Sequence, residues 1–116
     1  MNISIILLTY NSINYLDKFI ESIYSQTFQN FELIIVDNYS TDGTVERINR
    51  LKLKNANLIQ FKNFGNMAAS RNIGIKNAKY EYLAFHDSDD YSHMYTVQSD
   101  PVESDEGSLI ELALDP

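Results

Sequence analysis

The amino-acid sequence predicts an α/β fold, an open parallel sheet with helices on both faces. Two observations support this prediction. Short continuous apolar runs, typical of strands buried on both faces, recur between residues 3 and 85. Segments with apolar residues at helical spacing separate these runs and give the order β-α-β-α-β-α-β. This alternation implies right-handed crossovers between parallel strands.

The first half of the chain contains two of the predicted strands and two helices. Residues 3–8 form the first apolar run, which the turn and capping residues 9–12 end. Residues 13–24 place apolar side chains at helical spacing between charged ones. Residues 31–36 form the second run, and the turn at residues 40–44 precedes a second helical pattern.

The second half repeats the alternation and then loses it. Residues 57–61 predict a short third strand, residues 67–78 a third helix, and residues 80–85 a fourth strand. From Tyr91 onward no strong periodicity remains, and only residues 109–114 suit a short helix. We therefore expect the sheet to end at the fourth strand, with one edge unpaired.

Composition and charge limit the classes of function. The 116 residues suffice for one domain with a real core, and the absence of cysteine excludes disulfides and thiolate metal sites. Residues 1–79 carry nine basic and six acidic side chains, whereas residues 80–116 carry ten acidic side chains and no Lys or Arg. No basic face with interleaved aromatic residues is evident, which argues against nucleic acid as a partner.

The most informative feature is the acidic cluster Asp87-Ser88-Asp89-Asp90, which directly follows the fourth apolar run. Crowded carboxylates at the end of a buried strand repel one another unless a cation neutralises them. From extended backbone, Asp87 and Asp89 point the same way and offer oxygens to one hard cation. A solvated acidic turn is the plainer alternative, since Asp and Ser are common in turns.

Other polar residues also follow the predicted strands, where open α/β sheets bind their ligands. Thr9, Tyr10 and Asn11 follow the first strand, Asp37 and Asn38 the second, and residues 63–66 the third. Each has a structural alternative as a helix cap, a strand terminator or a turn residue. The glycine-rich phosphate cradles of dinucleotide and P-loop folds are absent. Bound phosphates would therefore need a metal ion and a cation such as Arg71.

The ordered set of motifs resembles the start of family 2 glycosyltransferases. The resemblance covers residues 1–91. It rests on residues 5–11, 31–44, 66–75 and 82–90, and on Leu16, Ser22-Ile23 and Gln26-Thr27 between the first two segments. It implies a GT-A (Rossmann-like) fold that binds a nucleotide-sugar donor, with UDP-sugar the first choice. It also implies Mg²⁺ or Mn²⁺ held by a DxD motif. Residues 92–116 would form an acidic tail outside this donor-binding half.

The resemblance assigns roles to individual residues. Thr9, Tyr10, Asn11 and Asp37 would line the base and ribose pocket, with Asp37 accepting hydrogen bonds from an imide or from ribose hydroxyls. Asn38 stands where the family often has a second Asp, so it keeps hydrogen-bonding capacity but adds no charge.

The remaining roles concern the phosphates and the metal. Arg71 would approach the donor phosphates. Asp87 and Ser88 would contact the nucleotide sugar, with Asp89 as the principal metal ligand and Asp87 beside it. Gly74 is predicted to be a close contact between a helix and the sheet.

The chemistry implied by the resemblance is transfer of a sugar to an acceptor hydroxyl with inversion at the anomeric carbon, on a saccharide or lipid-linked acceptor. No catalytic base is predicted, because Glu103, Asp105 and Glu106 stand in what the sequence indicates is a solvated loop. We therefore expect a truncated GT-A fold with a stable core, a mobile tail, self-association through the open sheet edge, and weak or absent transfer.

Two alternatives remain open from the sequence. The first is a non-catalytic nucleotide- or metal-binding α/β module, and the second is an interaction domain with an acidic tail. Cytoplasmic residence is expected, either free or peripheral to the inner face of a membrane, since no apolar run approaches the length of a membrane span.

Overall fold

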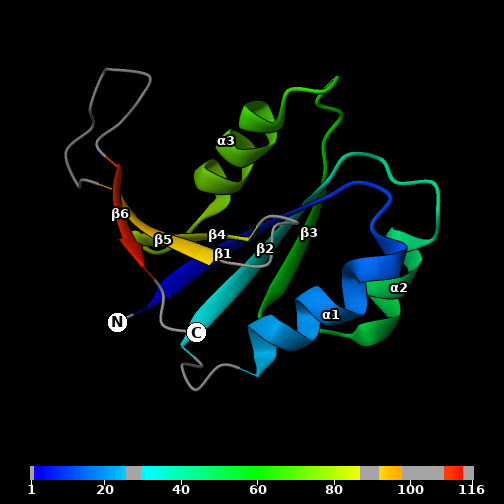
Figure 1. Cartoon of the computed structure of the whole chain (residues 1–116), viewed down its shortest axis with the longest axis horizontal. Helices are drawn as coiled ribbons and strands as arrows, with labels where there is room; N and C mark the ends of the chain where they lie inside the picture. The colour runs from blue at the N-terminus through cyan, green and yellow to red at the C-terminus, as the bar shows by residue number, and fades with distance from the viewer. Residues whose placement is uncertain (1, 26–29, 87–91, 98–108, 114–116) are drawn as a thin grey trace.

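The computed structural model describes residues 2–25, 30–86, 92–97 and 109–113. Its centre is a six-stranded sheet with the order β3-β2-β1-β4-β5-β6, covered by three helices (Figure 1). The elements are β1 (Ile3–Thr9), α1 (Ile13–Tyr24), β2 (Phe31–Asp37), α2 (Thr44–Leu51), β3 (Ala56–Gln60), α3 (Met67–Asn77), β4 (Tyr82–His86), β5 (Ser92–Val97) and β6 (Leu109–Ala113).

The four parallel strands confirm the predicted α/β architecture. β1 pairs with β2 and with β4, and β2 pairs with β3, all in parallel. Because each of these strands runs the same way, their carboxyl ends meet at one edge of the sheet. The observed bounds lie within two residues of the predicted ones.

The prediction that the sheet ends at its fourth strand is wrong. β5 pairs antiparallel with β4, and β6 pairs antiparallel with β5. The edge of β4 is therefore paired with β5. The expected self-association depended on an unpaired edge at β4, so that reason for it no longer holds. The predicted short helix over residues 109–114 is also wrong, since residues 109–113 form β6. A short apolar run suits either structure, and pairing with a distant strand decides the outcome.

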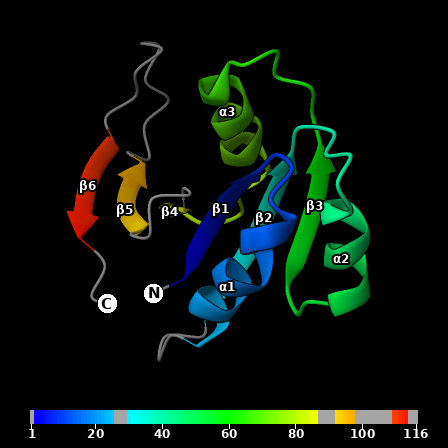
Figure 2. The same cartoon turned by 45° about the vertical axis from the view of Figure 1, so that its right-hand side comes forward.

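The helices cover both faces of the sheet and bury two cores. Figures 1 and 2 show α3 on one face and α1 with α2 on the other. The apolar stripe of α1 packs on the larger core, whose strand residues include Ile5, Leu33 and Ile35. α3 covers a smaller core centred on Ile6 and Ile34. Strand side chains alternate between the two faces, so β1 and β2 supply both cores and are buried almost throughout.

Gly74 is a close contact between α3 and the sheet, which confirms its predicted role. A Cβ atom built at Gly74 would lie 2.6 Å from Cγ2 of Ile6 and 3.1 Å from both Cδ1 and Cγ1 of the same side chain. Ile6 is fully buried, so it has little room to move away. Glycine at this position therefore allows α3 to pack closely against β1.

Gly74→Ala is expected to lower the free energy of unfolding by about 1 to 2 kcal/mol, because the cost of overpacking exceeds the gain in helix propensity. Urea denaturation followed by circular dichroism measures this loss. In an Ile6→Ala background, which removes Cγ1, Cγ2 and Cδ1, Gly74→Ala should cost clearly less than in the original chain. A single variant as stable as the original chain would show that the contact is not tight.

Candidate functional site

The carboxyl ends of four strands bring the candidate residues to one edge of the sheet. Thr9 at the end of β1 is in register with Asp37 at the end of β2, and Asp37 is in register with Gln60 of β3. On the other side of β1, Leu7 is in register with His86, the last residue of β4. The described loops that follow Thr9, Asp37 and Gln60 therefore share one region above the sheet, and β4 ends at the same edge.

Asp37 is the buried centre of this edge. Its carboxylate is fully buried, and Oδ1 accepts hydrogen bonds from the hydroxyls of Thr9 at 2.7 Å and Ser40 at 2.6 Å. Oδ2 accepts from the backbone N–H of Ser40 at 2.8 Å. Burial of a carboxylate is costly unless such donors surround it. Asp37 thus joins β1 to the loop after β2.

The loop of residues 38–44 is tied to the start of α1 through side chains. The Asn11 side chain accepts from the backbone N–H of Thr41 at 2.8 Å, and Asp42 accepts from the N–H of Ile13 at 3.1 Å. Asp42 also accepts from the hydroxyl and N–H of Thr44. Desolvation acts to raise the pKa of Asp42, but these hydrogen bonds outweigh it and hold the pKa below its usual value.

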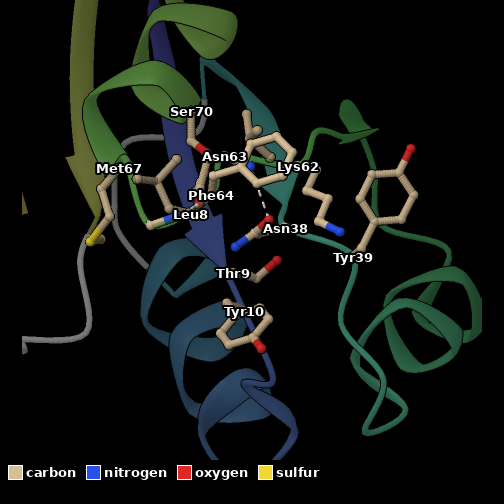
Figure 3. A pocket seen from close by; sticks show the side chains of 12 residues that line it. Leu8, Thr9, Tyr10, Asn38, Tyr39, Lys62, Asn63, Phe64, Met67 and Ser70 are labelled. Carbon is tan, nitrogen blue, oxygen red and sulfur yellow. Dashed lines mark hydrogen bonds between the residues drawn. The ribbon is translucent and has the colours of Figure 1, made fainter.

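A cavity of about 640 Å³ opens beside these loops, in the size range of small-molecule sites. Figure 3 shows side chains from the ends of β1 and β2 and from the loop before α3 gathered around it. The cavity is lined by Leu8, Thr9, Tyr10, Val36, Asn38, Tyr39, Lys62, Asn63, Phe64, Gly65, Met67 and Ser70.

Hydrogen bonds of Asn63 hold the polar side of this cavity together. Its backbone N–H donates to Oδ1 of Asn38 at 3.0 Å (Figure 3), and its side-chain Nδ2 donates to the Ser70 hydroxyl at 2.8 Å. Its Oδ1 accepts from the N–H of Gly65 at 2.9 Å. Asn63 thereby connects the loop after β2, the loop after β3 and α3, and both polar atoms of its side-chain amide are hydrogen-bonded within the protein.

The mouth of the cavity is aromatic. Tyr10, Tyr39 and Phe64 line it with exposed fractions of 60%, 53% and 85%. Tyr39 and Phe64 have φ values of 48° and 52°, in the left-handed region that bulky residues rarely adopt. Lys62 adds a positive charge, with Nζ 5.3 Å from the centroid of the Phe64 ring. Exposed rings and a cation at a cavity suit a flat, anionic ligand.

The structure brings some of the predicted site residues together and separates others. Thr9, Tyr10 and Asn38 line the cavity, whereas Asp37 is fully buried and is not a lining residue. Asn11 is exposed and hydrogen-bonded to the 38–44 loop. The site prediction gave Asp37 a direct contact with base or ribose, and this contact stays a prediction. In the structure the carboxylate accepts three hydrogen bonds from Thr9 and Ser40.

Of the residues predicted to bind phosphate and metal, the structure describes only Arg71. Arg71 follows the cavity residue Ser70 on α3 and is half-buried. Asp87, Ser88 and Asp89 lie outside the described residues, as does the segment that contains Glu103, Asp105 and Glu106. Within the described ranges, no group of three or more His, Cys, Asp or Glu side chains could hold a metal ion.

Sequence reasoning missed Tyr39, Lys62 and Met67 as cavity residues. Tyr39 stands directly after the predicted pair Asp37 and Asn38, so its place past a strand end was available as a signal. No sequence motif identifies Lys62 as a cavity residue. Its role at the cavity depends on the turn after β3, which the sequence does not specify.

The family model for glycosyl transferase family 2 matches residues 4–99, most of the chain. The chain belongs to glycosyl transferase family 2. This membership confirms the resemblance found in the motifs, and the parallel sheet with its helices matches the GT-A neighbours among solved structures.

Three known proteins illustrate the similarity. The Escherichia coli protein named UDP-Glc:alpha-D-GlcNAc-diphosphoundecaprenol beta-1,3-glucosyltransferase WfaP is 44% identical over 91 residues, 77% of this chain and 36% of that protein. The crystal structure of S. aureus TarS 1-349 in complex with UDP-GlcNAc has a TM-score of 0.70 and 34% identity, over 77% of this chain and 27% of that one.

The third is the mannosyltransferase PcManGT from Pyrobaculum calidifontis in complex with GDP-Man and Mn²⁺, with a TM-score of 0.65. At 24% identity, over 71% of this chain and 26% of that one, this likeness shows the fold. The chain thus spans about a third or less of the length of these relatives. Among its described helices, none has the length and apolar character needed to cross a bilayer.

Proposed function

We propose that this chain binds the nucleoside diphosphate part of a nucleotide-sugar donor, a UDP-sugar, in the cavity above β1, β2 and β3. The single observation that carries the proposal is this cavity with its aromatic mouth, built at the strand ends of a family 2 member. The TarS structure, 34% identical, is a complex with UDP-GlcNAc and supports uridine as the nucleoside.

A divalent cation, Mg²⁺ or Mn²⁺, is part of the proposal. Leu7 of β1 is in register with His86 of β4, so the sequence that continues from His86 into Asp87 and Asp89 starts at the edge that carries the cavity. Carboxylate oxygens are the ligands that these hard cations prefer, and the chain lacks a glycine cradle for phosphates. When bound, the cation supplies charge neutralisation for the diphosphate.

The proposed reaction of the whole protein is transfer of the sugar from the diphosphate to a hydroxyl of a saccharide or lipid-linked acceptor, with inversion. The name of WfaP describes a diphosphoundecaprenol acceptor and supports a lipid-linked acceptor. The proposed location is the cytoplasm, free or peripheral to the inner face of a membrane. No residue of this chain is assigned as the base. Arg71 is proposed to approach the phosphates from α3, next to the cavity residue Ser70.

Isothermal titration calorimetry tests this function. UDP is titrated into the 116-residue chain with Mn²⁺ and again with EDTA, and circular dichroism verifies that the chain is folded. We expect saturable UDP binding with Mn²⁺ and weaker binding with EDTA. Absence of UDP binding by the folded chain in Mn²⁺ would overturn the proposal. Metal-dependent UDP binding by a full-length protein that never transfers a sugar would favour the non-catalytic module.

A further inference from the structure

Neither α1 nor α2 is capped by a side chain at its own N-cap position. The side chain of Ser12, the N-cap of α1, makes no capping hydrogen bond, and the N-cap of α2 is Gly43, which has no side chain. The first N–H groups of a helix have no acceptor inside the helix, so they need partners from elsewhere. At the start of both helices Asp42 provides such a partner.

The carboxylate of Asp42 caps the two helices at once. Its Oδ2 accepts a hydrogen bond from the N–H of Ile13, the first residue of α1, at 3.1 Å. Its Oδ1 accepts from the N–H of Thr44, the first residue of α2, at 3.0 Å and from the hydroxyl of the same residue. The Thr44 hydroxyl accepts in turn from the N–H of Ser12 at 2.9 Å. Asp42 therefore ties the start of α1 to the start of α2, where a negative charge also suits both helix dipoles.

This tie joins two chain segments that form walls of the cavity. Thr9 and Tyr10 come from the segment before α1, Asn38 and Tyr39 come from the segment before α2, and all four line the cavity (Figure 3). The segments are bonded to each other next to the strand ends, where the N–H of Asn38 donates to the carbonyl of Thr9 at 3.0 Å. Asp42 bonds them again at the helix starts. The two walls are therefore fixed to each other at both ends.

Each of these segments also contains a residue with a left-handed backbone. The φ values are 46° at Asn11 and 48° at Tyr39. Such a conformation is unfavourable for residues other than glycine, and it persists where surrounding bonds hold it. Ile13 follows Asn11 by two residues and Asp42 follows Tyr39 by three, so the bond between Asp42 and Ile13 closes both turns. Loss of this bond should let the two turns relax.

We propose that Asp42 is a positioning residue for the cavity, which holds the two wall segments at the spacing that UDP needs. Asp42 is not itself a lining residue, so it acts through the segments that it ties together. The proposal rests on the proposed function, since it takes UDP as the ligand of this cavity. Without the tie, a ligand that contacts both walls must order them as it binds, and this ordering lowers its affinity.

The substitution Asp42→Asn tests this role. It keeps the size of the side chain but replaces one acceptor oxygen with an NH₂ group, which cannot accept from a backbone N–H. Calorimetry in Mn²⁺ should show UDP affinity lowered about fivefold. The matched control is Asp17→Asn, which makes the same change in charge and breaks the 3.0 Å ion pair with Arg47 that also joins α1 to α2. Neither residue of this pair lines the cavity, so UDP affinity should stay within about twofold.

Amide spectra of the ¹⁵N-labelled free chain distinguish positioning from a local helix cap. Asp42→Asn should shift the signals of the cavity residues Tyr10 and Tyr39 as well as those of Ile13 and Thr44. A residue that only caps the helices would shift the signals at the helix starts and leave the cavity residues unchanged. Asp17→Asn should shift neither of the two tyrosines.

A second variant guards against loss of folding. In Asp42→Ser the hydroxyl still accepts from the N–H of Thr44 two residues on, but it has no second oxygen for Ile13. It should keep the cap of α2 and still lose UDP affinity. If UDP binds to the original chain with equal affinity in both folded variants, or if Asp17→Asn weakens it as much, the role of Asp42 is wrong while the proposed function stands. If UDP does not bind to the original chain, the proposed function itself fails and this inference fails with it.

Discussion

Asp89→Ala is expected to weaken UDP binding in Mn²⁺ by more than tenfold, which corresponds to about 1.4 kcal/mol or more. The reason is that the chain has only four glycines and no glycine-rich loop to hold phosphates with backbone N–H groups. The cation proposed at Asp87 and Asp89 would therefore carry most of the neutralisation of the diphosphate. Calorimetric titration with UDP in Mn²⁺ measures the loss.

The matched control is Asp105→Ala, which removes the same side chain and charge elsewhere in the acidic segment of the sequence. It should leave the UDP affinity within about twofold, since screening weakens charges that do not touch the ligand. Adding EDTA to the original chain should reproduce the effect of Asp89→Ala. Equal UDP affinity in EDTA and in Mn²⁺ would remove the basis for a metal site at this motif.

Asp37→Ala is expected to lower the free energy of unfolding by about 3 kcal/mol and also to weaken uridine binding without metal. The carboxylate accepts three hydrogen bonds in full burial, and its loss would leave the Thr9 hydroxyl and the N–H of Ser40 unpaired. Thr9 lines the cavity, so loosening this network disturbs the wall. Urea denaturation and a titration with uridine measure the two effects.

Glu32→Ala provides a matched control on the same strand. Glu32 lies at the opposite end of β2, where it accepts hydrogen bonds from the Ser4 hydroxyl and the N–H of Lys79, both at 2.6 Å. Its removal should also destabilise the fold but should leave uridine binding by the folded chain unchanged. If both variants weaken uridine binding equally, the effect of Asp37→Ala reflects general stability and not the cavity wall.

The parallel half of the fold was predictable because its signals are local. Buried parallel strands are continuous apolar runs, and α1 shows its apolar stripe in the sequence itself. The pairing of β5 with β4 and β6 was not predictable, since it joins segments that lack a strong period of their own. Leu109–Ala113 shows the difficulty, because five residues of mixed apolar character do not distinguish strand from helix.

The candidate site was predictable in position but only partly in detail. Strand ends in the sequence located Thr9, Tyr10 and Asn38, which line the cavity. Asp37 follows from the same signal, but its hydrogen bonds with Thr9 and Ser40 were not predicted. The position of Tyr39 at the cavity depends on its left-handed φ, which the sequence does not predict.

Amide chemical-shift mapping of the ¹⁵N-labelled chain during titration with UDP and Mg²⁺ tests the central proposal most directly. We predict the largest changes at Thr9, Tyr10 and Asn38, with further changes in the loop of residues 62–67 and at the start of α3. The opposite edge of the sheet, around Ser4 and Lys79, should remain unchanged. Changes confined to that opposite edge, or none at saturating UDP, would contradict nucleotide binding at this cavity.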